Sequence, residues 1–286
     1  MIKLLLNIFS RNVGKSPTAE MSFFEHLDEL RGHIFKSAVA VAIGACLVAY
    51  YNNFIVRRIL MGPMHPDFPT YTFLCKVGDK LNLGSTLCLH QINIKMQSNA
   101  VGGQFGVYFN IILIGGFIIA FPYVFWQFWK FIKPGLTSTE AKNTKGVIFW
   151  VSFLFFIGVL FGYYVLAPYT VNFFANFSLD DNIENLWTIN SYFNTIVPLI
   201  LGAGLSFQLP LVMYFLGKAD IVTASYLRRV RKYAVLIIFI IAGIIAPPDM
   251  LSMIICAIPL VLLYEISILL CKRVEKKKKI ADPEWS

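Results

Sequence analysis

Charged side chains are scarce in this 286-residue chain. They make up 14% of the residues, while hydrophobic residues make up 57%; a typical soluble domain is about 25% charged. This composition excludes an ordinary water-soluble protein. It predicts a polytopic membrane protein, because uncharged runs of about 20 residues match the ~30 Å hydrocarbon core of a bilayer at 1.5 Å per helical residue.

The sequence also lacks the patterns that bind metals and nucleotides or that build nucleophiles. Its four histidines show no metal-ligand spacing. The segment "NVGKS" at 12–16 lacks the first glycine of a phosphate-binding loop, because that position is Phe9. No serine lies in a nucleophile-elbow pattern. We therefore expect no enzymatic activity, no cofactor, no metal and no nucleic-acid partner.

A cleavable signal peptide is not expected, and cysteines are few. The apolar core "LLLNI" near the N-terminus is too short for a signal peptide, and no small-residue cleavage site follows it. Cys46, Cys256 and Cys271 lie in apolar runs and are expected to be packing residues. Cys75 and Cys88 share one long loop, where a disulfide and two free thiols are equally open alternatives, both structural.

The long runs are solidly apolar instead of alternating with period two, so they predict helices and not the strands of a membrane barrel. We expect an all-α protein with six transmembrane helices and a long loop, 53–105, after the first. The predicted spans are 34–52, 106–129, 147–167, 194–217, 232–246 and 250–271.

The last two spans are expected to be short. Sixteen uncharged residues at 233–248 give roughly 24 Å of helix, several Å less than the hydrocarbon core, and the run 250–264 is no longer. Short helices can be accommodated by local thinning of the bilayer. One hypothesis is that this half of the protein thins the membrane where partners assemble; the alternative is that neighbouring spans cover the short ends.

Basic residues predict the orientation of the chain in the membrane. Lysine and arginine gather in the N-terminal tail, in the connections after spans two and four, and in the C-terminal tail. All four segments fall on one side if the spans alternate, so both termini are expected in the cytoplasm. The opposite segment, 168–190, carries three acids and no base; loop 53–105, with five basic residues, is an exception long enough for its charges to weigh less.

Two groups of acidic residues lie on the expected cytoplasmic side. In "EHLDELR" at 25–31, Glu25, Asp28 and Glu29 share one helix face, either as a helix-terminal turn that complements the helix dipole or as a ligand site. "TSTE" at 137–140 has the form of a capping box, yet Glu140 is the only acid in a connection with four lysines. Together these acids could bind a cationic ligand through charge-assisted hydrogen bonds to arginine.

Several motifs in order carry a resemblance to a known family. They are "FFEHLDELR" at 23–31, "MGPM" with Pro63, "FPYVFWQFWKFIKPGLTSTE" at 121–140, "APPDM" at 246–250 and "AIPLVLLYEI" at 257–266. The chain thereby resembles TatC, the multispanning receptor of twin-arginine protein translocation. The resemblance covers residues 22–271, which leaves a cytoplasmic tail at 1–21 and a basic cytoplasmic tail at 272–286.

The resemblance implies a receptor in the cytoplasmic membrane for Arg-Arg signal peptides of proteins exported already folded. It implies that Glu29 and Glu140 pair with the guanidinium groups and that Arg31 orders the acidic tip. The surface around them would be shaped by Phe131, Pro134 and Leu136. Implied partners are small single-span proteins of the TatA and TatB type and other copies of the chain, with the proton-motive force as energy source.

A few polar residues within or beside the spans are further candidates. Gln208 stands where the family has glutamate or glutamine, so a titrating carrier is excluded there, while a partner contact and an interhelical bond within the chain are equally open. Asp249 is a second candidate for a partner contact or a simple turn residue. Glu265 is expected to snorkel or to pair with a nearby base. The prolines expected to be structural are Pro63, Pro122, Pro247 and Pro248.

The main rival is an ion-coupled transporter of small solutes. Such a protein should show inverted repeats, broken helices at matching positions and a buried ionisable pair near the middle of the membrane. The mid-span candidate here is the neutral Gln208, which counts against that class.

Overall fold

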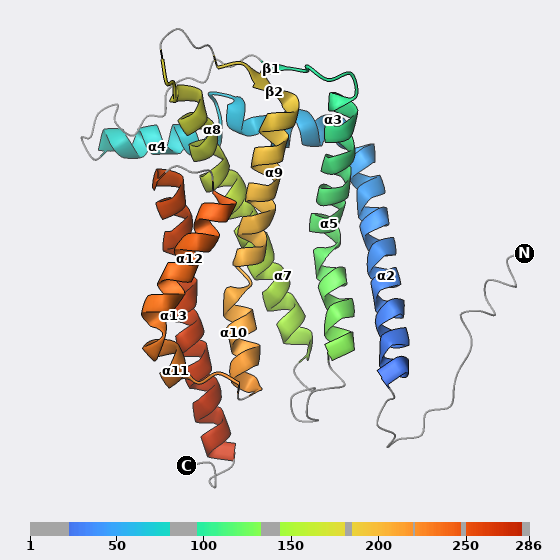
Figure 1. Ribbon diagram of the computed structural model, residues 1–286, viewed down its shortest axis with the longest axis vertical. Helices are drawn as coiled ribbons and strands as arrows, with labels where there is room; N and C mark the ends of the chain where they lie inside the picture. The colour runs from blue at the N-terminus through green and yellow to red at the C-terminus, as the bar shows by residue number, and fades with distance from the viewer. Residues whose placement is uncertain are drawn as a thin grey trace, which may run out of the picture.

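The computed structural model describes residues 23–80, 96–132, 144–180, 185–219, 221–246 and 250–281. Helices dominate these residues (Figure 1). Five helical segments in this part of the chain are long and apolar enough to cross a membrane: 28–50, 103–132, 146–176, 189–218 and 252–276. They coincide with five of the six predicted spans. The remaining one corresponds to α12 (Arg231–Ile245), a helix of 15 residues.

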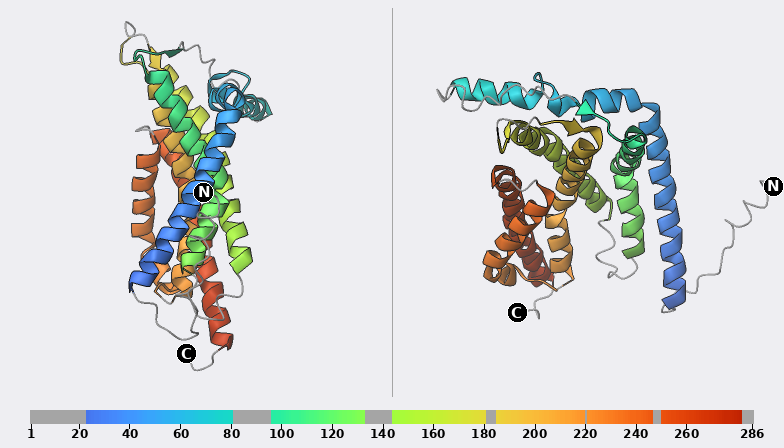
Figure 2. Two further views of the ribbon diagram at one scale, coloured as in Figure 1. Left: turned by 90° about the vertical axis from the view of Figure 1, so that its right-hand side faces the viewer. Right: turned by 45° about the horizontal axis from the view of Figure 1, so that its top comes forward.

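The first two membrane helices lie side by side (Figures 1 and 2). They are α2 (Phe23–Tyr50) and α5 (Gly103–Ile132), and they pack along much of their length. Small residues allow this close approach, because a Cβ on Gly116 would lie 2.5 Å from the backbone nitrogen of Ala45, and one on Gly44 would lie 2.6 Å from the Gly116 carbonyl oxygen. Pro122 lies inside α5 and is partly buried.

The third membrane segment is a continuous succession of three helices in the middle of the bundle. It consists of α7 (Thr144–Phe161), a π-helical stretch η5 (Gly162–Leu166) and α8 (Ala167–Asn176). It packs against α9 (Ile189–Ser206) through another glycine contact, where a Cβ on Gly158 would lie 2.8 Å from the Ala203 carbonyl oxygen. The segment is therefore held by close backbone packing on its α9 side.

The fourth predicted span is two helices instead of one. After α9, the α-helix is interrupted at Phe207 and Gln208, and α10 (Leu209–Lys218) follows. Pro210 in the first turn of α10 lacks the backbone N–H that a continuous helix would use. This interruption places Gln208 at a helix junction inside the span.

Of the two final helices that were predicted to be short, the first is short and the second is long. α11 (Ala224–Arg229) leads into the 15-residue α12, which is about 22 Å long. The last helix, α13 (Met250–Ala281), has 32 residues, or about 48 Å. The uncharged run ends at Glu265, but the helix continues through that residue, whose carboxylate pairs with Arg231 on α12 within a 25-residue candidate span of α13.

The segment predicted as a long loop after the first span contains helical structure. We call residues 52–80 the lateral arm; it comprises α3 (Asn52–Phe54), π-helix η1 (Ile55–Leu60), 3₁₀-helix η2 (Gly62–Met64) and α4 (Pro69–Lys80). The arm runs across the end of the bundle, roughly perpendicular to α2 and α5 (Figure 2). Beyond it, β1 (Met96–Gln97) pairs in parallel with β2 (Trp187–Thr188).

Tyrosine hydroxyls attach the lateral arm to the bundle. Tyr192 on α9 donates to the Leu60 carbonyl at 2.7 Å, and Tyr163 in η5 donates to the Ile59 carbonyl at 2.7 Å. Within the arm, Tyr71 donates to the carbonyl of buried Pro63 at 2.5 Å, and burial raises the pKa of this phenol. These bonds satisfy backbone carbonyls that the irregular helices leave without helical partners.

Of the three cysteines expected to be packing residues, Cys256 and Cys271 are buried, whereas Cys46 is exposed. Cys75 in α4 is disulfide-bonded, whereas Cys46, Cys256 and Cys271 are free. Cys88, the predicted alternative partner of Cys75, lies outside the described residues. Cys271 is buried and donates to the Met213 carbonyl at 3.2 Å, which joins α13 to α10.

Candidate functional site

The candidate site lies at the end of the bundle opposite the lateral arm. α2 begins at this end and α13 finishes there, while α5 and α10 also terminate there and α7 begins (Figure 1). We call it the tail end. The connection from Ile132 to Thr144, which contains Glu140, Pro134 and Leu136, leaves and re-enters the described structure at the tail end. These three predicted site residues themselves lie outside the described residues.

Glu29 lies in the second turn of α2, at the tail end. Its side chain is 37% exposed, so the carboxylate can reach a ligand without a large desolvation cost. One turn further along the same helix face, His33 places its Nε2 atom 3.9 Å from the Glu29 Oε1 atom. The carboxylate is thus accessible and already faces a side chain that can carry positive charge.

His33 also contacts Gln127 of α5, a contact that was not predicted from the sequence. The His33 Nδ1 atom lies 2.8 Å from the Oε1 atom of Gln127 on α5. Gln127 is only 3% exposed, and the His33 side chain is 13% exposed. The available signal was an isolated amide in the aromatic segment "FWQFW" at 125–129, since a buried amide needs a hydrogen-bond partner.

The remaining described site residues are less directly connected to Glu29. Arg31 is exposed, and it makes no ion pair within the described ranges, so no contact here supports the predicted ordering of the acidic tip. Phe131 is partly buried in the last turn of α5. In the same turn, the Lys130 ammonium lies 3.8 Å from the centroid of the Trp126 ring, a cation–π contact.

Gln208 lies at the α9–α10 junction with only half of its amide satisfied. Its Nε2 atom donates to the Val151 carbonyl of α7 at 3.3 Å. Its Oε1 atom is buried and has no hydrogen-bond partner among the described residues. An acceptor buried without a donor is costly, so Gln208 contributes an unmet hydrogen-bonding group to the interior of the span.

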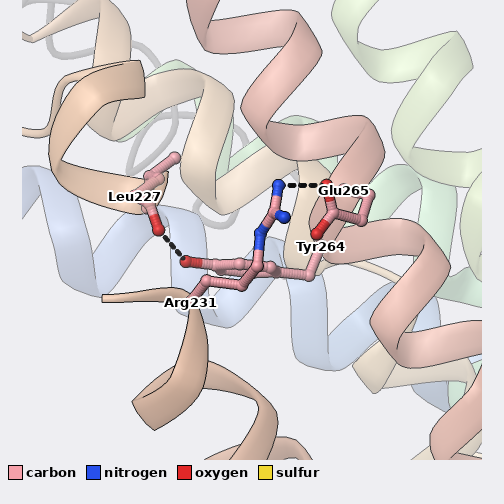
Figure 3. Close-up of polar contacts among 4 residues, drawn as sticks. All are labelled: Leu227, Arg231, Tyr264 and Glu265. Carbon is pink, nitrogen blue, oxygen red and sulfur yellow. Dashed lines mark hydrogen bonds and ion pairs between the residues drawn. The ribbon is translucent and has the colours of Figure 1, made fainter. Parts of the chain in front are cut away.

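A second polar cluster joins α11, α12 and α13 (Figure 3). The Arg231 Nη2 atom of α12 lies 2.9 Å from the Glu265 Oε2 atom of α13, with the two side chains 51% and 41% exposed. The adjacent Tyr264 is buried and donates to the Leu227 carbonyl of α11 at 2.8 Å. The expectation that Glu265 pairs with a nearby base is confirmed.

The other predicted residues lie in the lateral arm, within α5 or outside the described ranges. Pro63 is buried in η2 and Pro122 lies within α5. Asp249, Pro247 and Pro248 lie outside the described residues. Within the described part of the chain, no group of three or more histidine, cysteine or acidic side chains is arranged to hold a metal ion.

Comparisons with known proteins agree with this architecture. The family model described as "Sec-independent protein translocase protein (TatC)" matches residues 25–259. The chain is 38% identical to the Sec-independent protein translocase protein TatC of Blattabacterium over 265 residues, which cover 92% of this chain and all of that protein. It is 34% identical to the TatC protein of Desulforapulum autotrophicum, covering 96% and 91% of the two chains.

Solved structures give the same result. A crystal structure described as the twin arginine translocase receptor TatC in DDM is 31% identical, with a TM-score of 0.68 over 86% of this chain and 99% of that chain. A second crystal structure of the TatC receptor gives a TM-score of 0.67 at 30% identity, over 88% of this chain and all of that chain. The chain therefore belongs to the TatC family and is a membrane component of the Sec-independent protein translocase.

Proposed function

We propose that this chain is the signal-peptide receptor of a twin-arginine translocase and the core on which the translocation site assembles. The observation that carries the proposal is the accessible Glu29 carboxylate at the tail end, in a chain of the TatC family. The crystal structures that it resembles are described as translocase receptors. Each arginine of a signal peptide offers a planar fork of donors that a carboxylate can accept in a bidentate manner.

In this proposal, Glu29 binds one guanidinium and Glu140 binds the second. Phe131, Pro134 and Leu136 contribute apolar surface beside the peptide, and Arg31 orders the acidic segment. The start of α2 and the two ends of the connection that contains Glu140 share the tail end, which supports a single site. Lysine would serve less well, because its ammonium is a point charge without the geometry of the fork.

The proposed topology has six spans, with α12 as the fifth, and places the tail end in the cytoplasm. The basic residues that follow α10 and end α13 support this orientation. The bilayer would be the cytoplasmic membrane. Partners would be single-span proteins of the TatA and TatB type and other copies of this chain, with the half-satisfied amide of Gln208 as one contact and Asp249 as another.

An ion-coupled solute transporter is the less favoured alternative. The Arg231–Glu265 pair is half exposed, whereas such a transporter should have a buried ionisable pair. Gln208 is uncharged at every pH. Uptake of labelled solutes into vesicles that contain the purified chain, dependent on an ion gradient, would restore this alternative.

The proposal is tested by binding of a peptide with Arg-Arg and of its Lys-Lys twin to the purified full chain. Wild type should prefer Arg-Arg, and Glu29→Gln and Glu140→Gln should each weaken Arg-Arg binding by about 5- to 150-fold, because a charged hydrogen bond contributes about 1–3 kcal/mol. Asp28→Asn is the matched control. It removes an exposed acid one residue away and should change affinity by less than about fivefold.

Two results would reject the receptor role of these acids. One is equal affinity for the two peptides in wild type. The other is an Arg-Arg affinity that Glu29→Gln and Asp28→Asn lower equally, since a loss that depends on net charge alone indicates no specific site.

A further inference from the structure

We propose that His33 is a positioning residue that competes with the arginine guanidinium for Glu29, so that Arg-Arg peptides bind more weakly when His33 is protonated. This inference rests on the proposed receptor function of Glu29. It assigns a role to a contact that joins α2 to α5 through three side chains: Glu29, His33 and Gln127.

The contact with Gln127 favours one tautomer of His33. The Gln127 Oε1 atom lies 2.8 Å from the His33 Nδ1 atom, and the tautomer with its hydrogen on Nδ1 is the one that satisfies this amide oxygen of a buried residue. Nε2, which faces Glu29 at 3.9 Å, is then the nitrogen that gains or loses a proton. Gln127 is buried in α5 and does not titrate, so the ring stays in place in both states.

The protonated and the neutral imidazole of His33 present different surroundings to the Glu29 carboxylate. With Nε2 protonated, a cation lies beside the carboxylate, occupies part of its accepting capacity and repels an incoming guanidinium. Without that proton, Nε2 offers a lone pair, and Glu29 is free to accept both donors of the guanidinium fork. Histidine is the side chain that ordinarily makes this change between pH 5 and 8.

Among the described residues, the other charged side chains of α2 and α5 do not face the His33 imidazole. On α2, Asp28, Arg31 and Lys36 are exposed side chains. On α5, which packs against α2, the group that meets the ring is the neutral Gln127, and the Lys130 ammonium lies over the Trp126 ring. Among the described residues, Glu29 is therefore the charged side chain that faces the imidazole.

The test measures Arg-Arg peptide affinity between pH 6 and 8.5 on the full chain, with an acetylated peptide that contains no histidine. Model carboxylates titrate near pH 4, below this range. Wild-type affinity should rise about three- to fivefold from pH 6 to 8.5, the size expected for a partly exposed charge pair. His33→Asn, whose amide can still donate to Gln127, should show a flat profile at the wild-type affinity of pH 8.5, and His33→Gln should also be flat.

One histidine variant is the matched control. His65→Asn changes an exposed histidine of the lateral arm and should keep the wild-type slope. If His33→Asn and His33→Gln retain that slope, or if wild type shows none, the inference is overturned.

Glu29→Gln separates failure of this inference from failure of the proposed function. If Glu29→Gln weakens binding at pH 8.5 while the His33 variants keep the wild-type slope, only the role of His33 is wrong. If Glu29→Gln has no effect at any pH, the receptor site itself is wrong and the inference falls with it. If the affinity of Glu29→Gln still rises with pH as wild type does, His33 does not act through Glu29.

Discussion

A single methyl group at Gly116 should separate α2 from α5 and loosen the candidate site. A Cβ there would lie 2.5 Å from the backbone nitrogen of Ala45, 2.8 Å from its Cα atom and 2.9 Å from the Val41 carbonyl oxygen. Heavy atoms in contact ordinarily lie about 3.5 Å apart, so α2 would have to move by roughly 1 Å. All three neighbours are backbone atoms, which cannot rotate away.

The cost follows from this geometry. Overpacking typically destabilises a protein by about 1–3 kcal/mol, and backbone neighbours place Gly116→Ala toward the upper part of that range. For a chain of this size, the loss corresponds to a fall of about 3–10 °C in the thermal midpoint. A movement of roughly 1 Å would also weaken the 2.8 Å contact between His33 and Gln127, which lies on the same pair of helices.

The assay is thermal unfolding of the purified chain in detergent, followed by tryptophan fluorescence, with Gly106→Ala as the matched control. Gly106 is on the same helix, and a Cβ there would meet nothing within 4 Å. Gly106→Ala should leave the midpoint unchanged or raise it, because alanine favours a helix over glycine by about 0.5–1 kcal/mol. Equal midpoints for the two variants would refute the argument that α2 and α5 meet through backbone contact at Gly116.

Two further predictions concern the polar residues of the later helices. A double-mutant cycle of Arg231→Gln and Glu265→Gln, followed by thermal unfolding, should give a coupling energy of about 0.3–1 kcal/mol, since both side chains are half exposed. A coupling energy near zero would show that the pair contributes no stability. Gln208→Leu should change the free energy of unfolding of the isolated chain by less than about 1 kcal/mol, because it removes an unsatisfied acceptor together with one long 3.3 Å hydrogen bond. The same variant should reduce the co-purification of single-span partners. Strong destabilisation with normal co-purification would instead assign Gln208 to packing within the chain.

Hydropathy was sufficient to predict most of the membrane helices. The uncharged runs coincide with α2, α5, the α7–α8 segment and the α9–α10 segment, because a span needs about 20 apolar residues whatever its neighbours are. The lateral arm could not be predicted in this way. The α4 helix of the arm is short and of mixed polarity. The arm is attached to the bundle by contacts such as the hydrogen bond from Tyr192 to the Leu60 carbonyl, which joins residues 132 positions apart.

The candidate site was predicted only in part, because one of its contacts joins residues far apart in the sequence. Glu29 was identifiable because acids stand out on the side of the chain where lysine and arginine gather. The partnership of His33 with Gln127 joins residues 94 positions apart, and no local pattern indicates which polar residues of two apolar helices meet. The half of the site around Glu140 remains a prediction from the sequence.

The length of α13 changes the argument about membrane thickness. The sequence suggested that both final helices are too short for the bilayer, which made thinning a property of this whole half of the protein. With about 48 Å in α13 and about 22 Å in α12, the proposed six-span topology confines the mismatch to α12. Arg231 is the first residue of α12 and pairs with Glu265, which lies 11 residues before Lys276 on α13 (Figure 3). The ion pair therefore fixes where the short helix begins along the long one, and any local adjustment of lipid should occur on the α12 side.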